Sequence, residues 1–151
     1  MDVGEICTRE VVTVTRDETV LEAARRMRRH HVGALVVVQG HPPRPVGILT
    51  DRDIAVGIVA QGVEDIPRLL VGDVLTRDEA DVVTAYEGDS ALWTAWQMRD
   101  AGVRRVPVID DDGLLVGILS MDDLLQMLVD QLTEIVELIR GQQIKEGLER
   151  A

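Results

Sequence analysis

The sequence has few aromatic residues and a single cysteine. Among its 151 residues there is no phenylalanine, and tryptophan and tyrosine bring the aromatic content to only 2%. The hydrophobic interior must therefore be built from valine, leucine, isoleucine, alanine and methionine, which suits thin and closely packed α/β layers. The lone Cys7 excludes an internal disulfide and a cysteine-based metal or redox pair. We interpret it as a small hydrophobic residue.

The sequence also lacks the features of membrane and nucleic-acid-binding proteins. No apolar run approaches the length needed to cross a bilayer, and residues 1–10 have no basic start followed by an apolar stretch. The 27 acidic and 16 basic residues give a net charge of -11, which repels nucleic acid and anionic membranes. His30, His31 and His41 lack the spacing of a metal site. We therefore expect a cytoplasmic protein with no metal, nucleic-acid or membrane partner.

An internal repeat is the most informative feature of the chain. Residues 3–8 (VGEICT) recur as 71–76 (VGDVLT), 11–13 (VVT) recur as 82–84 (VVT), and 46–50 (VGILT) recur as 116–120 (VGILS). The offset between the copies changes only within polar or proline-rich stretches, as expected of loops. We predict a first domain at 3–60, a linker at 61–70, a second domain at 71–128 and a helical tail at 129–151.

Periodicity within each copy predicts the order β-α-β-β-α, which is an α/β fold. In the first copy we expect a strand at 11–14 and a helix that begins after Thr19 and runs to about residue 29. A buried strand at 34–38, a turn at 40–45 and a strand at 46–49 follow, and Thr50 opens a second helix that reaches about residue 60. In the second copy, Asp110–Gly113 is expected to be the hairpin turn.

Two related segments stand where a predicted strand meets a helix. Residues 47–53 (GILTDRD) and 117–123 (GILSMDD) share a glycine, two apolar residues, a Thr or Ser, and an aspartate three positions later. In one interpretation Thr50 or Ser120 caps the helix, with Asp53 or Asp123 in its first turn. In the other, the same groups bind the phosphate and ribose of a nucleotide. Their occurrence at matching places in both copies favours the second interpretation, although duplication alone would preserve part of the pattern.

These two segments, together with 32–38 (VGALVVV) and 103–108 (VRRVPV), resemble CBS domains, small modules named after cystathionine β-synthase that associate in pairs. The resemblance covers nearly all of residues 3–128. It implies that the two repeats pack through their sheets about a pseudo-two-fold axis, followed here by a C-terminal helical extension. It also implies two non-catalytic clefts that bind adenosine-containing ligands such as AMP, ADP or ATP, with no cofactor required.

The resemblance assigns roles to residues of both copies. Asp53 and Asp123 would hold ribose hydroxyls, while Thr50 and Ser120 would contact ribose or phosphate. The residues expected beside the adenine base are Val12, Thr13, Val83 and Thr84, with Ala34 offering backbone contacts near it.

Basic residues distinguish the two expected clefts. Arg52 follows the first hydroxyl residue and is the natural phosphate partner, whereas the second copy has Asp122 at this place. Arg104 and Arg105 stand where the first copy has the neutral residues 33–34. They either contact phosphate or extend into solvent. We predict that the cleft with Arg52 binds its ligand more tightly.

Two apolar surfaces suggest contacts beyond a single module. Trp93 and Trp96 replace charged residues of the first copy, which indicates a protein interface or a surface covered by the tail. The tail is expected to be a helix from residue 122 to about 140, which Gly141 ends or loosens. Its apolar stripe would pack on its own module or on a second subunit.

These observations lead to three hypotheses. The first is a homodimeric regulatory module that binds an adenine nucleotide and reports occupancy to a separate effector protein. The second is a dimerisation or docking scaffold without ligand. The third is an enzyme, which is disfavoured because the sequence has no nucleophile and base set and no glycine loop of the Walker type.

Overall fold

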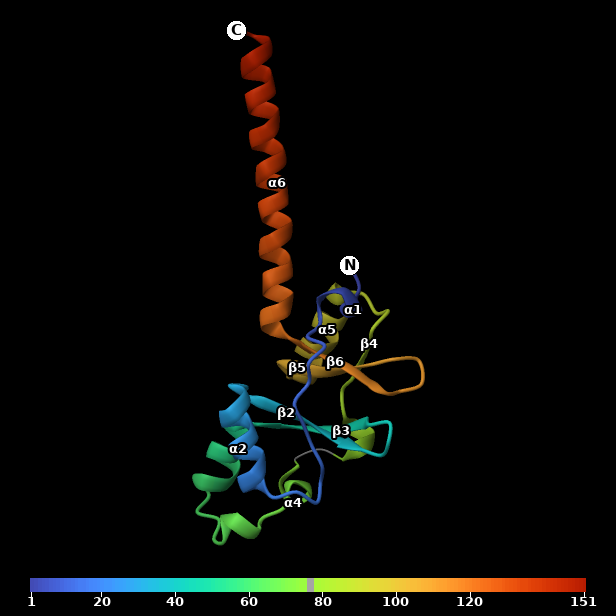
Figure 1. The fold of residues 1–151 in the computed structure, drawn as a ribbon, viewed down its shortest axis with the longest axis vertical. Coiled ribbons are helices and arrows are strands. Elements are labelled where there is room, and N and C mark those ends of the chain that lie inside the picture. Colours follow the sequence, from blue (N-terminus) through green and yellow to red (C-terminus); the bar gives the residue numbers. More distant parts are fainter. Residues whose placement is uncertain (76–77) are drawn as a thin grey trace.

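The computed structural model of the chain describes residues 1–75 and 78–151, so that Thr76, which the repeat aligns with Thr8, lies outside the described residues. Within the described ranges the strands form two sheets of three, in the orders β1-β2-β3 and β4-β5-β6 (Figure 1). In each sheet the first strand is parallel to the second, and the second and third form an antiparallel hairpin. The predicted α/β fold with two matching repeats is confirmed.

The first repeat follows the predicted order of elements. Its regular elements are β1 (Thr13–Val14), α2 (Val20–His30), β2 (Ala34–Gln39), β3 (Arg44–Thr50) and α3 (Asp51–Ile54). The Thr19 hydroxyl accepts a hydrogen bond from the Glu22 backbone N–H at 3.1 Å, which fixes the start of α2. β1 is shorter than predicted because it pairs only with Val36 and Val37. α3 continues as a π-helix, Ala55–Val59, and a short 3-10 turn, Ile66–Arg68, lies in the expected linker.

The second repeat has the same order. It contains α4 (Val71–Val74), a 3-10 turn at Glu79–Asp81, β4 (Ala85–Tyr86), α5 (Ala91–Ala101), β5 (Arg105–Ile109), β6 (Leu115–Ser120) and α6 (Met121–Glu149). The repeat places the first strand of this copy at 82–85, whereas β4 occupies only 85–86, because Val82 still belongs to the end of the 3-10 turn. The aspartates at 110–112 form the hairpin turn before Gly113, as predicted.

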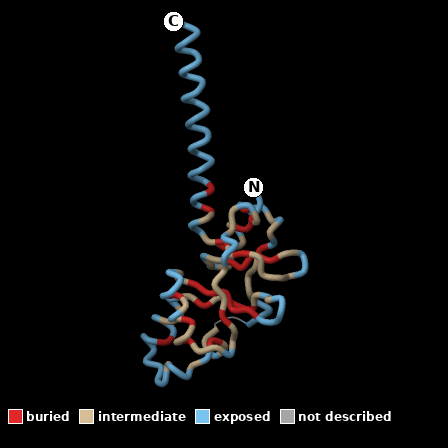
Figure 2. Tube along the Cα trace, viewed as in Figure 1, coloured by how far each residue is buried: buried red, intermediate tan, exposed pale blue. Residues whose placement is uncertain are grey.

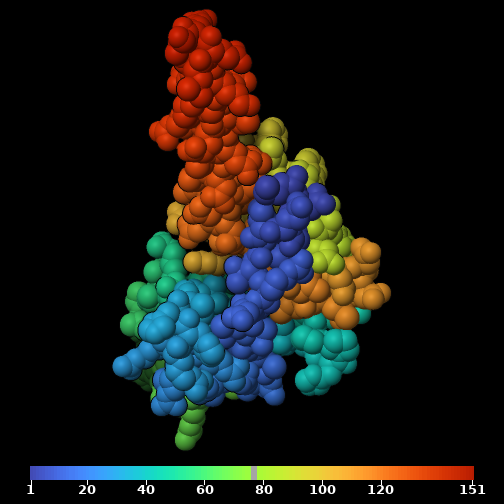
Figure 3. All heavy atoms as spheres, turned by 45° about the horizontal axis from the view of Figure 1, so that its top comes forward, coloured from blue at the N-terminus to red at the C-terminus, as the bar shows by residue number. Residues whose placement is uncertain are grey.

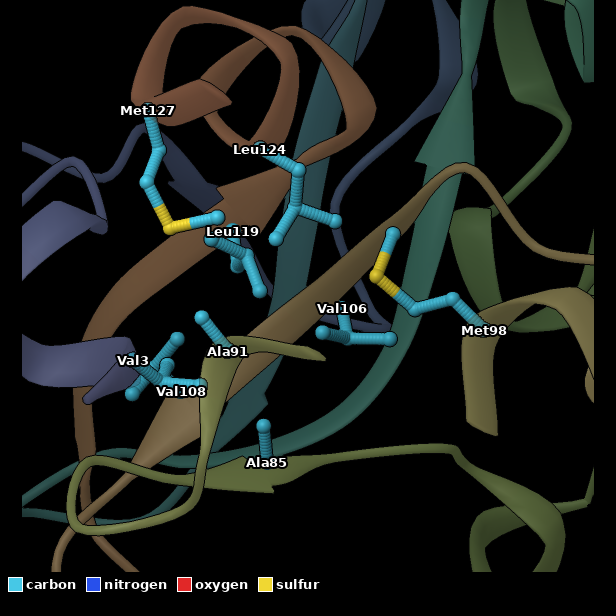
Figure 4. Packing of buried hydrophobic residues seen from close by; sticks show 9 residues of the cluster. All are labelled: Val3, Ala85, Ala91, Met98, Val106, Val108, Leu119, Leu124 and Met127. Carbon is cyan, nitrogen blue, oxygen red and sulfur yellow. The ribbon is translucent and has the colours of Figure 1, made fainter. Parts of the chain in front are cut away.

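The two repeats exchange their leading helical turns. α1 (Val3–Ile6) packs into the second repeat, where buried Val3 lies near Ala91 and Val108 (Figure 4). Conversely, buried Val71 of α4 belongs to the hydrophobic core of the first repeat. The N-terminal segment therefore runs along the surface of both repeats, as the dark blue band in Figure 3 shows. Such a reciprocal exchange is what a pseudo-two-fold relation between the copies produces.

The long C-terminal helix α6 leaves the module after its first two turns. Leu124 and Met127 are buried against the second repeat, but every residue from Leu128 onward is exposed (Figures 1 and 2). The expected bound at about residue 140 is wrong, since Gly141 does not end the helix, which continues to Glu149. None of the described helices is long and apolar enough to cross a membrane.

Candidate functional site

A cleft of about 770 Å³ lies between the two repeats. The first repeat contributes the end of β3 and all but the last residue of α3, and the second contributes the segments before β4 and β5. Its lining residues are Gly47, Ile48, Thr50, Asp51, Arg52 and Asp53 from the first repeat, and Leu75, Val82, Val83, Gly102, Val103, Arg104 and Arg105 from the second. The lining therefore combines apolar side chains with both acidic and basic groups.

Thr50 and Asp53 hold each other in a reciprocal capping box. The Thr50 backbone N–H donates to Asp53 Oδ2 at 2.9 Å, and the Asp53 backbone N–H donates to Thr50 Oγ1 at 3.1 Å. The capping interpretation of this motif is therefore confirmed. Only one carboxylate oxygen is used, because within the described residues Asp53 Oδ1 forms no hydrogen bond. The cap orients the carboxylate and leaves its other oxygen free to accept from a ligand.

Ser120 and Asp123 form the same box at the start of α6. Asp123 Oδ2 accepts from the Ser120 backbone N–H at 2.7 Å and from Ser120 Oγ at 2.8 Å. The Asp123 backbone N–H in turn donates to Ser120 Oγ at 3.2 Å. This pair lies outside the cleft described above, in the corresponding place of the second repeat.

Three guanidinium groups line the cleft. Arg52 and Arg104 are exposed and Arg105 is partly buried. Across the described parts of the chain, none of the three side chains forms a salt bridge or a hydrogen bond. Positive charge from both repeats thus converges on the cleft that contains Asp53, and it is not neutralised by an ion pair.

The predicted site residues divide between this cleft and other places. The cleft brings together Thr50, Arg52, Asp53, Val83, Arg104 and Arg105. The residues that do not line it are Val12, Thr13, Ala34, Thr84, Ser120 and Asp123. Their assignment to a ligand stays a prediction.

Several lining residues were missed from the sequence. Leu75 and Val103 contribute apolar walls, and Asp51 adds a carboxylate whose Oδ1 accepts from the Arg52 backbone N–H at 2.8 Å. Leu75 and Val103 align with the apolar residues Cys7 and Val32 of the first copy, so the repeat indicated an apolar role for both positions but not a place in the cleft.

The N-terminal segment packs tightly against β6 at the corresponding place of the second repeat. Thr8 and Ile118 exchange two backbone hydrogen bonds of 2.9 Å each. A Cβ added to Gly117 would lie 2.7 Å from the Cys7 sulfur and 3.1 Å from the Thr8 carbonyl oxygen. Burial raises the pKa of the Cys7 thiol, so this group stays protonated and acts as packing.

Comparisons with known proteins agree with this architecture. The family model for the CBS domain matches residues 3–60 and 71–130. An uncharacterized protein of Methanopyrus kandleri is 35% identical over 127 residues, which cover 84% of this chain and 62% of that protein. The mitochondrial CBS domain-containing protein CBSX3 of Arabidopsis thaliana is 36% identical over 118 residues, which cover 78% of this chain and 56% of that protein. The chain thus spans less than two thirds of the length of these two relatives.

A solved structure shares both the fold and a related sequence. It is a CBS domain pair in complex with 5′-methylthioadenosine and S-adenosyl-L-methionine, with 27% identity and a TM-score of 0.74. The superposition covers 87% of this chain and 98% of that one. With two matched repeats, two matching sheets and this structural likeness, the chain belongs to the CBS domain family and contains a pair of CBS domains.

Proposed function

We propose that this CBS pair is a regulatory module whose inter-repeat cleft binds an adenine nucleotide, AMP, ADP or ATP, and signals its occupancy to a separate effector protein. The observation that carries the proposal is the meeting of Arg52, Arg104 and Arg105 with Asp53 in one cleft. Unpaired guanidinium groups are suited to phosphate, and an oriented carboxylate is suited to the ribose hydroxyls.

The remaining lining fits the third part of a nucleotide. Ile48, Val82 and Val83 offer an apolar surface for a flat base, and the volume of about 770 Å³ lies within the usual range for small-molecule sites. Asp53 Oδ1 is the acceptor for a ribose hydroxyl, because Oδ2 is already held by the Thr50 backbone. In this proposal base, sugar and phosphate each contact a different part of the cleft.

The charge of the cleft distinguishes between adenosine-containing ligands. The related CBS pair was solved with S-adenosyl-L-methionine, whose sulfonium carries a positive charge. In this chain three arginines against two aspartates give the cleft lining a net positive charge, which would disfavour a cation and attract the phosphates of a nucleotide. We therefore expect ATP to bind more tightly than AMP, and both more tightly than S-adenosyl-L-methionine.

A thermal-shift series with ATP, AMP and S-adenosyl-L-methionine tests the proposal. Ligand at about one hundred times its dissociation constant adds roughly 2.7 kcal/mol of stability. Asp53→Asn keeps an oxygen for the cap but removes the anionic acceptor, so it should reduce the nucleotide-dependent shift. Asp123→Asn is the matched comparison for the loss of the cap, since Asp123 has the same capping role outside this cleft, and it should reduce the shift less than Asp53→Asn. No shift with any nucleotide would contradict the proposal and favour a ligand-free scaffold.

The proposal includes a homodimer. Trp93 and Trp96 on α5 are 59% and 62% exposed, so α6 does not cover them. The Arg99 guanidinium lies 4.9 Å from the centre of the Trp96 ring. Exposed tryptophan is enriched where protein surfaces are buried on association, which supports contact of this face with another chain.

A further inference from the structure

One face of α6 carries an unbroken apolar stripe that the module does not cover. Eight side chains form it, and each is between 43% and 63% exposed. The members of the α6 stripe are Met121, Leu125, Leu128, Val129, Leu132, Ile135, Val136 and Ile139. Spacings of three and four residues keep them on one side of the helix over 19 residues, a length of about 28 Å.

Charged side chains avoid this face. Asp130, Glu134 and Glu137 lie on the opposite side of the helix by the same periodicity. Beyond Ile139 the face becomes polar, with Gln143 and Glu146 continuing the line of the stripe. The stripe is therefore bounded at one end by the module and at the other by polar residues.

The projecting part of α6 needs a partner to be stable as a helix. From Leu128 to Glu149 every residue is exposed, so no other part of the described chain buries this segment. An isolated helix of this kind is marginal in water, because most helical stability in proteins comes from packing of an apolar face. Gly141 and Gly147 lower its intrinsic helix propensity further.

We propose that the α6 stripe packs against the same stripe of a second copy of this chain. Summed from the exposed fractions, its eight residues present roughly 800 Å², so the most that one copy can bury here is close to one partner's share of a standard protein interface. Such an area exceeds the apolar patches of ordinary monomers, which are about 300–600 Å². Three apolar positions per heptad give a helix the broad face that bundles bury, and two identical faces are self-complementary about a two-fold axis.

The charge distribution permits this pairing. The stretch from Met121 to Ile139 contains five acidic residues and no basic residue, so close contact between two copies could be repulsive. Because Asp130, Glu134 and Glu137 point away from the stripe, face-to-face packing leaves these three carboxylates in water. The inference is independent of the nucleotide cleft, since no residue of the stripe lines it.

Sedimentation equilibrium or light scattering of the full chain tests the α6 interface. The wild type should have twice the chain mass of 16.7 kDa. Leu132→Glu places a charge at the middle of the stripe and should give the monomer mass, as should Ile135→Glu. Leu148→Glu is the matched control. Leu148 is a leucine of the same helix that is 74% exposed, compared with 63% for Leu132, but it lies outside the stripe. This variant should therefore stay dimeric.

Other outcomes would overturn the α6 interface. They are a monomeric wild type, a dimeric Leu132→Glu variant, or dissociation of Leu148→Glu to the same extent. Trp93→Ala with Trp96→Ala separates this interface from a dimer formed by α5. If the tryptophan variant dissociates while Leu132→Glu stays dimeric, the homodimer stands and the α6 interface fails. A retained unfolding transition in each variant shows that the module itself is folded.

Discussion

Removal of Arg105 should weaken ATP binding more than removal of any arginine outside the cleft. A hydrogen bond to a charged group contributes about 1.5–3 kcal/mol, and each 1.4 kcal/mol is a tenfold change in affinity. Arg105 is partly buried and forms no ion pair within the described residues, so it can bind phosphate without first breaking another contact. Arg105→Ala should therefore raise the Kd for ATP by about tenfold to one hundredfold.

Arg52 and Arg104 are exposed, so water and salt screen their charges more fully. Their alanine variants should lose less affinity for ATP, about threefold to tenfold, which is below the range for hydrogen bonds to charged groups. Isothermal titration at low salt gives these values, and adenosine without phosphate should bind all variants alike. Arg28→Ala, an exposed arginine of α2 outside the cleft, should leave the Kd unchanged. Equal ATP affinities of wild type and Arg105→Ala would refute the assignment of phosphate to this cleft.

Three further predictions address asymmetry, packing and pH. Asp53→Ala should weaken nucleotide binding more than Asp123→Ala in titration calorimetry. Equal losses of affinity would contradict the prediction that the site with Asp53 binds more tightly than the site with Asp123. Gly117→Ala should lower the free energy of unfolding in urea by about 1–3 kcal/mol because its Cβ meets Cys7, and Cys7→Ala should recover part of this loss; an unchanged midpoint would contradict the packing. Burial alone would raise the pKa of Glu18, but hydrogen bonds from Arg26 and Thr15 outweigh it and lower that pKa. The stability that Glu18 contributes should thus be present above its ordinary pKa of 4.5 and lost at lower pH. The free energy of unfolding in urea should therefore differ between Glu18→Gln and wild type at pH 7, and the two values should converge in acid. A difference that stays constant with pH would refute this prediction.

Local sequence signals predicted most of the secondary structure. The buried strand β2 was readable because five apolar residues follow Gly33 without a break, and α2 because Thr19 and Glu22 have capping spacing. The end of α6 was not predicted correctly. Glycine in a helix costs only about 1 kcal/mol relative to alanine, and the good helix formers Gln142, Gln143 and Lys145 follow Gly141.

The exchange of leading turns could not be read from local patterns. Val3 and Val71 each stand at the start of their own copy, and nothing in their neighbourhood indicates which core receives them. The choice depends on the path of the chain, since Val3 donates its backbone N–H to Asp89 and Val71 to Glu18. Contacts between residues so distant in sequence follow from the whole packing arrangement. The boundaries 3–60 and 71–128 stay a prediction from the repeat, and each core includes a turn from the other copy.

The charge of the cleft follows from the way in which the two repeats pack against each other. The motif of the first copy supplies Arg52 and Asp53, but Arg104 and Arg105 come from the strand entry of the second copy. In the reciprocal arrangement, the motif with Asp122 would meet the neutral residues 33–34. Each of these sequence differences between the copies thus adds positive charge to the cleft with Arg52 and none to the other. A sequence comparison shows these differences one by one, whereas only the fold shows that the three arginines meet in one cleft. For this reason we expect selectivity for phosphate-containing ligands in that cleft.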